Sequence, residues 1–205
     1  MKYIILSMIV GYVFGCCQTG YFVGKLNRID IRDYGSGNSG TTNTLRVLGK
    51  RAALFTFLGD ALKGLFTVMI ARYAFLPHVD MDPQLFLMLA GFGAVLGHNF
   101  PVIMKFKGGK GIATTGGVLC GIHPLLALFC IIIFASVTAA SKYVSLGSIC
   151  MVSGIPFMMI ILYGVRPQVI IMGCVYAALA IFQHRANIGR LIQGTENKLG
   201  QKVKR

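Results

Sequence analysis

The absence of charged side chains from long stretches of this chain limits its fold more than any other feature of the sequence. Five stretches contain no Asp, Glu, Lys or Arg: residues 3–24, 83–104, 111–141, 143–165 and 167–184. A helix needs about 20 predominantly apolar residues to cross a bilayer. Charged residues make up 13% of the chain, whereas soluble domains carry about 25%. We therefore predict an all-α integral membrane protein, a polytopic helix bundle. Since the connectors are short, residues 1–205 are expected to form a single membrane-embedded domain.

The basic residues are concentrated in three connectors, which carry most of the net formal charge of +14. Residues 25–51 hold six basic and two acidic side chains, residues 105–111 hold three basic ones, and the segment after residue 183 holds six basic and one acidic. The connector 77–84 has two aspartates and no Lys or Arg. Because basic connectors remain in the cytoplasm, we predict an outside N-terminus and a cytoplasmic C-terminus. Charges beside membrane spans indicate lipid headgroups rather than nucleic acid as the partner.

The number of crossings follows from the apolar blocks, which cover residues 3–24, 52–76, 84–104, 112–140, 146–163 and 167–183. Six crossings from an outside start would leave the basic tail outside, against the charge rule. Block 112–140 exceeds one span, and Pro124 disfavours a continuous helix, so we predict a break at His123-Pro124 and seven spans. The helix before this break would be only about 16 Å long. Five spans, with one C-terminal block that does not cross, are the alternative.

The six cysteines lie in the apolar blocks without metal-ligand spacing. We interpret them as small hydrophobic residues rather than as disulfides or metal ligands, and we expect no metal site. The first apolar run has the length of a span and lacks a clear cleavage motif. We therefore expect an uncleaved first helix rather than a signal peptide.

The first basic connector contains a glycine-rich polar segment, GSGNSGTTNTLR, at residues 35–46. Its glycines let the backbone approach a ligand closely, and its hydroxyl, amide and backbone N–H groups are phosphate donors. If Thr41 or Thr42 caps the next helix, the helix N-terminus would add further amides. The G-x-G-x-x-G spacing is not interpreted as a dinucleotide fingerprint, because no βαβ unit surrounds it. A Walker A loop is excluded because Thr41 stands where its lysine belongs.

Two further polar segments read GHNFPVIMKFKGGKGIAT at residues 97–114 and HRANIGRLIQGTE at residues 184–196. In the former, lysines alternate with glycines, which places ammonium groups beside exposed amides, as a phosphate or acyl-phosphate site requires. In the latter, His184, Asn187 and Arg190 recur at three-residue spacing, which would align them along one helix face. We call residues 35–46, 97–114 and 184–196 the three glycine-rich segments and predict that they converge at the cytoplasmic membrane surface. Asp60 and Lys63, one helical turn apart in an apolar block, are expected to form an ion pair that supports this site.

Together, the three segments resemble the signature motifs of the bacterial acyl-phosphate:glycerol-3-phosphate acyltransferases, the PlsY family. Motif order, length and span pattern agree over essentially the whole chain. The resemblance implies an enzyme that transfers a fatty acyl group from acyl phosphate to the 1-hydroxyl of sn-glycerol 3-phosphate. The products would be lysophosphatidate and inorganic phosphate, in the first step of bacterial phospholipid synthesis. The resemblance also implies a multi-pass protein of the plasma membrane, with a cytoplasmic site, no metal, no cofactor and no obligate protein partner.

On this basis we predict four candidate catalytic residues: His184, Ser36, Lys110 and Asn187. The candidate substrate-binding residues are Gly35, Ser36, Gly37, Asn38, Thr41, Thr42, Asn43, Arg46, His98, Asn99, Lys105, Lys107, Gly108, Gly109, Lys110, Gly111, Thr114, His184, Arg185, Asn187 and Glu196. Since an acyl phosphate is already activated, positioning and charge neutralisation can replace a covalent intermediate. The proton acceptor is either the substrate's own phosphate or His184, and the assignment of segments to the two phosphates is open.

The competing hypothesis is a membrane transporter of phosphorylated metabolites. Such a protein is expected to show internal pseudo-symmetry and polar residues at the bilayer midplane. The sequence has no internal repeat, and its polar residues gather toward one surface. We therefore favour the acyltransferase.

Overall fold

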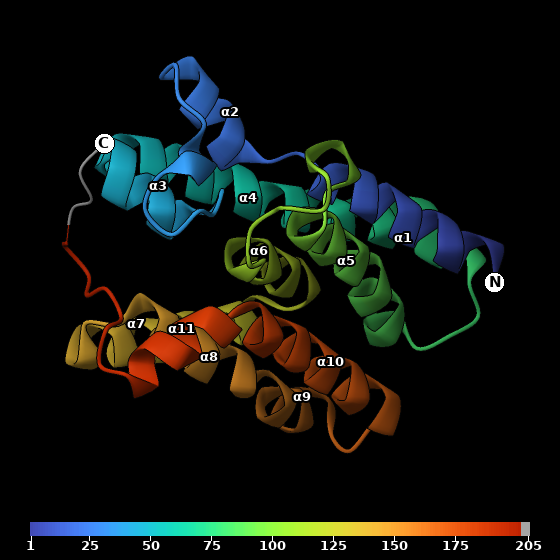
Figure 1. Ribbon diagram of the computed structural model, residues 1–205. Coiled ribbons are helices and arrows are strands. Elements are labelled where there is room, and N and C mark those ends of the chain that lie inside the picture. Colours follow the sequence, from blue (N-terminus) through green and yellow to red (C-terminus); the bar gives the residue numbers. More distant parts are fainter. Residues whose placement is uncertain (202–205) are drawn as a thin grey trace.

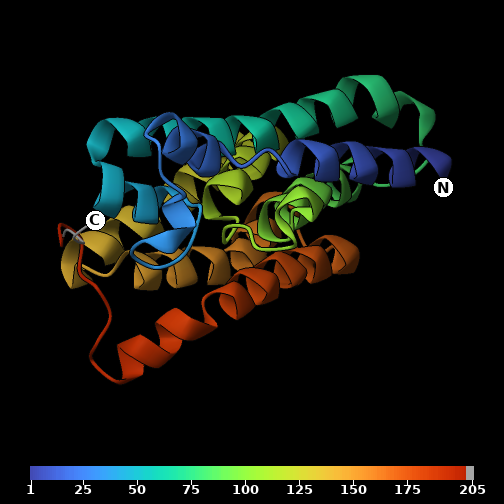
Figure 2. The same ribbon diagram turned by 45° about the horizontal axis from the view of Figure 1, so that its top comes forward.

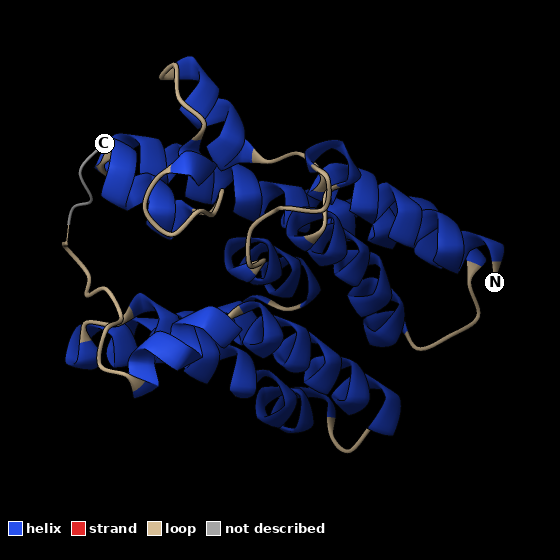
Figure 3. Cartoon of the chain, viewed as in Figure 1, coloured by secondary structure: helices blue, strands red, loops and turns tan. Residues whose placement is uncertain are grey.

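The computed structural model describes residues 1–201 and is built from helices, with no strand in that range (Figure 3). Lys202, Lys204 and Arg205 of the predicted cytoplasmic tail lie outside the described residues. The α-helices are α1 (Lys2–Gly15), α2 (Thr19–Leu26), α3 (Thr41–Leu48), α4 (Lys50–Ile70), α5 (Pro83–Asn99), α6 (Ile112–Ile122), α7 (Pro124–Ser141), α8 (Val144–Ser153), α9 (Ile155–Tyr163), α10 (Pro167–Gln183) and α11 (Arg185–Ile192). The predicted all-α fold class is confirmed.

Five helical segments are long and apolar enough to cross a membrane: Lys2–Leu26, Lys50–His78, Pro83–Met104, Pro124–Ser141 and Val144–Tyr163. Helices α10 and α11 qualify only as a pair, bent by 61°, and α6 is a shorter apolar helix. The chain is therefore a multi-pass membrane protein, as predicted. The number of crossings stays a prediction.

The short helix α6 ends at the predicted break, where one side chain caps the start of α7 and another bonds the end of α6. Helix α7 begins at Pro124, a first-turn position where the missing N–H costs nothing. The imidazole of His123 accepts the Leu125 N–H at 3.3 Å. The Arg72 guanidinium donates to the carbonyl oxygens of Gly121 and Ile122 at 2.8 and 3.2 Å, so the last turn of α6 is satisfied inside the bundle.

Helices α1 and α5 pack in backbone contact because glycines line their interface. A Cβ atom at Gly93 would collide with the carbonyl oxygen of Met8, and one at Gly97 would collide with that of Tyr12. Gly11 on α1 faces α5 in the same way. Small residues allow this close approach between membrane helices. The contact fixes the C-terminal end of α5, from which the second glycine-rich segment leaves.

The two ends of the bundle carry different segments (Figures 1 and 2). The N-terminus lies beside the connector that follows α4, where the Tyr3 and His78 rings stack with centroids 5.0 Å apart. Arg166, in the connector after α9, joins this end through a 2.9 Å ion pair with Asp82. The three glycine-rich segments lie toward the opposite end.

Helix α6 lies between helices α1–α5 and helices α7–α11 (Figure 1). Its Val118 belongs to a buried apolar core together with Phe86 of α5, Leu126 of α7 and Tyr176 of α10. The Tyr176 hydroxyl donates to the carbonyl oxygen of Met88 at 2.8 Å, so its polar end is satisfied within this core. The core therefore connects the helices that carry the second and third glycine-rich segments.

Candidate active site

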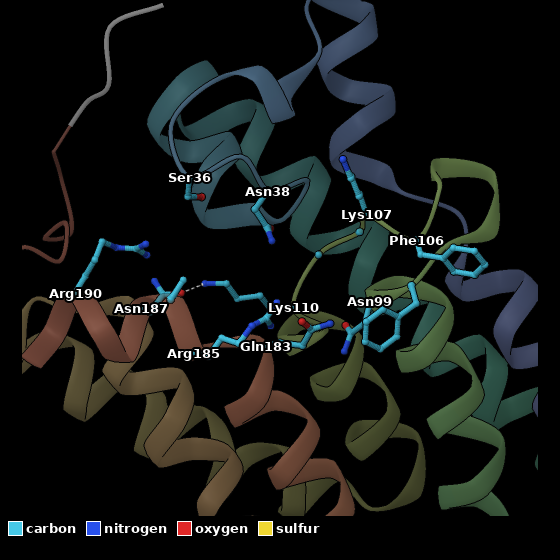
Figure 4. Close-up of a pocket in the computed structure, with 14 residues that line it drawn as sticks. Ser36, Asn38, Asn99, Phe106, Lys107, Lys110, Gln183, Arg185, Asn187 and Arg190 are labelled. Atoms are coloured by element: carbon cyan, nitrogen blue, oxygen red, sulfur yellow. Dashed lines mark hydrogen bonds between the residues drawn. The ribbon is translucent and has the colours of Figure 1, made fainter.

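A cavity of about 340 Å³ lies where the three glycine-rich segments meet (Figure 4). Its lining consists of Ser36, Asn38, Asn99, Phe100, Phe106, Lys107, Gly108, Gly109, Lys110, Gln183, Arg185, Ala186, Asn187 and Arg190. Four of these side chains are cationic, and none of the lining residues is acidic. The cavity is therefore suited to anionic ligands.

The side chain of Asn43 holds the first segment in its turn. Its Nδ2 lies within hydrogen-bond distance of the carbonyl oxygens of Ile31, Tyr34 and Asn38, at 3.0, 3.0 and 2.9 Å. Its Oδ1 accepts the N–H of Ser36 at 2.8 Å. Asn43 is buried behind the loop rather than in the cavity. The loop therefore presents Ser36 on a scaffold that an amide side chain fixes from within.

The start of helix α3 differs from the expectation that a threonine caps it. Gly40 is the N-cap, and the helix begins at Thr41 without a side-chain cap. The Asn38 side chain accepts the Gly40 N–H at 2.8 Å, and this turn places both Thr41 and Thr42 within the first helical turn. Among the described residues, the buried hydroxyl of Thr41 has no hydrogen-bond partner.

The second segment places Lys110 directly before the N-terminus of α6. The chain reverses through Lys105 and Phe106, whose φ angles are 53° and 61°. It then runs to Gly111, the N-cap of α6, whose φ of 80° favours glycine. The Gly109 N–H donates to the carbonyl oxygen of His98 at 3.0 Å, which fastens the loop to the end of α5.

Lys110 is the central cation of the cavity, and its ammonium group donates to Asn187 Oδ1 (Figure 4). Burial lowers the pKa of Lys110 to about 8. The carboxylate of Glu196 opposes this shift, while Arg190 and Arg46 add to it. The ammonium group is therefore charged at neutral pH but deprotonates more readily than an ordinary lysine.

The third segment is organised by the buried carboxylate of Glu196. Asn187 Nδ2 and Ser145 Oγ donate to its Oε1 at 2.7 and 3.1 Å, and Arg190 Nε donates to its Oε2 at 2.6 Å. Although burial opposes the shift, these hydrogen bonds and the Arg190 charge lower the pKa of Glu196. Asn187 thus joins Glu196 to Lys110, and the two helices α8 and α11 meet at this carboxylate.

Arg46 brings the first segment to the same cluster. Its guanidinium donates to the carbonyl oxygen of Asn197 at 3.3 Å, and burial, reinforced by Arg190, lowers its pKa despite the attraction of Glu196. Arg190 therefore pairs directly with the Glu196 carboxylate, which also attracts Arg46 and Lys110. This arrangement leaves an excess of positive charge beside the cavity.

A second polar layer lies behind the cavity and joins its loops to α1. Gln18 is fully buried at the break between α1 and α2, where its Nε2 donates to the carbonyl oxygen of His98 at 3.0 Å. Its Oε1 accepts the Ser39 hydroxyl at 2.8 Å. The predicted ion pair is confirmed in the same layer, with Lys63 Nζ 3.0 Å from Asp60 Oδ1 and both side chains buried.

Several predicted site residues surround the cavity without lining it: Gly35, Gly37, Thr41, Thr42, Asn43, Arg46, His98, Lys105, Gly111, Thr114, His184 and Glu196. His98 and His184 are buried, and Lys105 is exposed on the turn after α5. His184 Nδ1 lies 2.7 Å from the carbonyl oxygen of Ala180. Substrate contact by these residues stays a prediction.

The predicted site residues did not include five lining residues: Phe100, Phe106, Gln183, Ala186 and Arg190. The three-residue spacing had placed Arg190 on one helix face with His184 and Asn187, and this could have added it to the predicted site. Gln183 could have been found, because it is a polar residue at the end of an apolar block and directly precedes His184. Aromatic residues and alanine are ordinary in membrane helices and carry no such signal.

The amide of Asn99 is the least satisfied polar group of the lining. Within residues 1–201, neither its Nδ2 nor its Oδ1 has a hydrogen-bond partner, although the residue is buried. Buried amides are normally paired. Asn99 is therefore free to bind a polar group of a ligand or a water molecule.

No group of three or more His, Cys, Asp or Glu side chains in the described part is placed to hold a metal ion.

Comparisons with known proteins agree on one family. The family model described as "Glycerol-3-phosphate acyltransferase" matches residues 5–194. The glycerol-3-phosphate acyltransferase of Thermoanaerobacter pseudethanolicus is 46% identical to this chain, and the match covers 98% of each protein. That of Clostridioides difficile is 44% identical, and the match covers 98% of this chain and 97% of the relative.

Two crystal structures of PlsY, an integral membrane glycerol 3-phosphate acyltransferase, have the same fold. The glycerol 3-phosphate form superposes with a TM-score of 0.87 at 36% identity, covering 96% of each chain. The lysophosphatidic acid form superposes with a TM-score of 0.85 at 35% identity, covering 97% of this chain and 96% of the other.

The Glu196 cluster yields a first prediction. Glu196→Gln removes the charge that pairs with Arg190 and turns an N–H of the new amide toward the Arg190 donor. We expect a loss of about 1–3 kcal/mol in the free energy of unfolding, measured by thermal unfolding in detergent. Gln193→Ala, at an exposed position of the same segment, is the matched control and should change little. Equal stability of the two variants would contradict the role given to this carboxylate.

Proposed function

This chain belongs to the glycerol-3-phosphate acyltransferase family, and we propose that it transfers a fatty acyl group from acyl phosphate to the 1-hydroxyl of sn-glycerol 3-phosphate. It is a membrane acyltransferase of phospholipid biosynthesis, and its relatives give no support to the transporter alternative. In the proposed reaction the bond between the acyl carbon and the phosphate oxygen breaks, and an ester bond to the glycerol oxygen forms. The products are lysophosphatidate and inorganic phosphate.

The observation that carries this proposal is a cationic cavity without an acidic lining residue, at one end of a membrane bundle. Both proposed substrates are phosphate anions, and the reaction brings them together. Arg190 and Arg46 add positive charge beside Lys110, while the Glu196 carboxylate lowers their repulsion. Such a site speeds the reaction by positioning two anions and neutralising the charge that develops between them.

We assign the side chains as follows. Ser36, Thr41, Thr42 and Arg46 hold one phosphate together with Lys107, Lys110 and the N–H of Gly111. The N–H groups of Gly108 and Gly109 donate to the carbonyl oxygens of Asn99 and His98, and Asn43 holds the first loop in shape. Asn187 and His184 orient the glycerol 3-phosphate. Because His184 Nδ1 faces a carbonyl oxygen, that nitrogen carries a proton and Nε2 keeps its lone pair. The proton of the attacking 1-hydroxyl passes either to His184 Nε2 or to the phosphate of the glycerol 3-phosphate itself.

The proposed topology has seven spans, with the N-terminus outside and the active site on the cytoplasmic face of the plasma membrane. Residues 1–205 form a single domain in this proposal, with membrane lipid as its surroundings and no obligate protein partner. Support comes from the two ends of the bundle, because the aspartate-bearing connector lies with the N-terminus and the basic segments lie opposite. Helix α6 is then the short span.

Cysteine accessibility tests this topology. In a chain whose six native cysteines are replaced, Lys142→Cys should resist a membrane-impermeant thiol reagent added outside, whereas Arg166→Cys should react. Both residues are exposed and lie in the connectors before α8 and after α9. External labelling at residue 142 would exclude the seven-span arrangement.

The reaction is tested by phosphate release from the purified protein in lipid. With palmitoyl phosphate, release should require glycerol 3-phosphate and should equal the lysophosphatidate formed, while palmitoyl-CoA should not be consumed. Lys110→Met removes the central cation and should lower turnover roughly 100-fold. Turnover of palmitoyl-CoA in place of the acyl phosphate, or no turnover by folded protein, would contradict the proposed donor or the proposed reaction.

The lowered pKa of Lys110 gives a prediction for the pH dependence. The ammonium group that binds an anion is present below about pH 8 and is lost above it. We therefore expect kcat/KM to fall about tenfold per pH unit above that value. Lys110→Arg keeps its charge in this range and should show no such fall, although its absolute activity will be lower. A parallel fall in both proteins would assign the titration to another group.

A further inference from the structure

The ammonium group of Lys63 is the most completely coordinated charge in the membrane-embedded part of the described chain. Its Nζ donates to the carbonyl oxygens of Gly15 and Cys17 at 3.1 and 2.6 Å and lies 2.8 Å from His98 Nδ1. Asp60 Oδ1 lies 3.0 Å away but is not aligned as a hydrogen-bond acceptor. The three protons of the ammonium group therefore go to two carbonyls and one imidazole, and Asp60 compensates the charge.

This coordination decides the tautomer of His98. An ammonium group can only donate hydrogen bonds, so His98 Nδ1, 2.8 Å from Lys63 Nζ, must accept one. The proton of the neutral ring is therefore on Nε2. A proton on Nδ1 would instead face the ammonium group directly. His98 is buried, so bulk water does not compete for the hydrogen bonds of its two ring nitrogens.

The Nε2 edge of His98 lies directly beneath the glycine loop of the active site. A Cβ atom at Gly109 would collide with Nε2 and with the adjoining ring carbons. The backbone of the same residue is also fastened to His98, because the Gly109 N–H donates to its carbonyl oxygen. Lys110 follows immediately in the chain. The position of the imidazole therefore determines how closely Gly109, and with it Lys110, can approach the end of α5.

We propose that Lys63 is a positioning residue for acyl transfer: from within helix α4 it orients the His98 imidazole that supports Gly109 and Lys110. This inference rests on the proposed function and adds to it a residue outside the three glycine-rich segments. Lys63 does not line the cavity. A displacement of about 1 Å at a reacting centre can cost 100-fold in rate, so loss of this support should be measurable.

The first experiment is a double-mutant cycle on kcat/KM for glycerol 3-phosphate with palmitoyl phosphate as donor. Asp60→Leu with Lys63→Met removes both charges together, so that no buried charge is left unpaired. We expect about a 100-fold loss, a similar loss for His98→Ala, and no further loss when the changes are combined. Thr67→Val is the matched control, because the Thr67 hydroxyl bonds the Lys63 carbonyl oxygen and not its ammonium group. It should keep wild-type activity.

Losses that multiply in the combined variant, or wild-type activity in the charge-free pair, would overturn the inference. Both outcomes presuppose an active wild-type protein, whereas an inactive wild type would instead contradict the proposed function. If a variant fails to fold, nitrogen NMR of histidine-labelled wild-type protein shows which ring nitrogen of His98 carries the proton. The His98 signal is identified by its absence in His98→Gln or by selective labelling. A proton on Nε2 and an accepting Nδ1 are expected. A proton on Nδ1 would refute the role of Lys63.

Discussion

The balance of three cations against the Glu196 carboxylate, which pairs directly with Arg190 and attracts Arg46 and Lys110, is the interaction on which the proposed active site depends. Arg46, Lys110 and Arg190 come from three segments far apart in the sequence, and without a negative charge between them they would repel one another. Asn187 extends the influence of the carboxylate to Lys110 through an uncharged amide. One carboxylate is enough to hold the cluster together and too little to neutralise it. The remaining positive charge is what an anionic substrate would find.

A bilayer imposes a second condition, because it offers no water to unpaired backbone groups. Helix α1 breaks before α2 while still inside an apolar stretch, which leaves carbonyl oxygens without helical partners. Lys63 and Gln18 satisfy the carbonyls of Gly15 and Cys17 there. The same side chains contact His98, so the groups that satisfy the carbonyls of a helix break also support the loop to which we assign catalysis. Structural repair and function thus share one set of polar contacts.

The parts of this structure that were predictable depend on residues close together in the sequence. The break before Pro124 and the ion pair between Asp60 and Lys63 need only local information. The role of Gln18 could not be derived, because its partner His98 lies 80 positions away and its meaning depends on how α1 meets α5. The role of Arg72, a charge within the apolar block 52–76, likewise depends on a distant contact, with the end of α6. Motif residues could be named, but their division into a cavity lining and a supporting layer required the fold.

Helix α6 has a consequence of another kind, which follows from its polarity. Its N-terminus opens at Gly111 beside the cavity, and its last carbonyls rest on the Arg72 guanidinium on the far side of the bundle. The aligned peptide units of such a helix form a macrodipole with its positive end at the N-terminus. That field does not titrate, and in the low-dielectric bundle it is only weakly screened by salt. Part of the attraction for anions is therefore permanent, and a guanidinium at the opposite end of the short helix helps to maintain it.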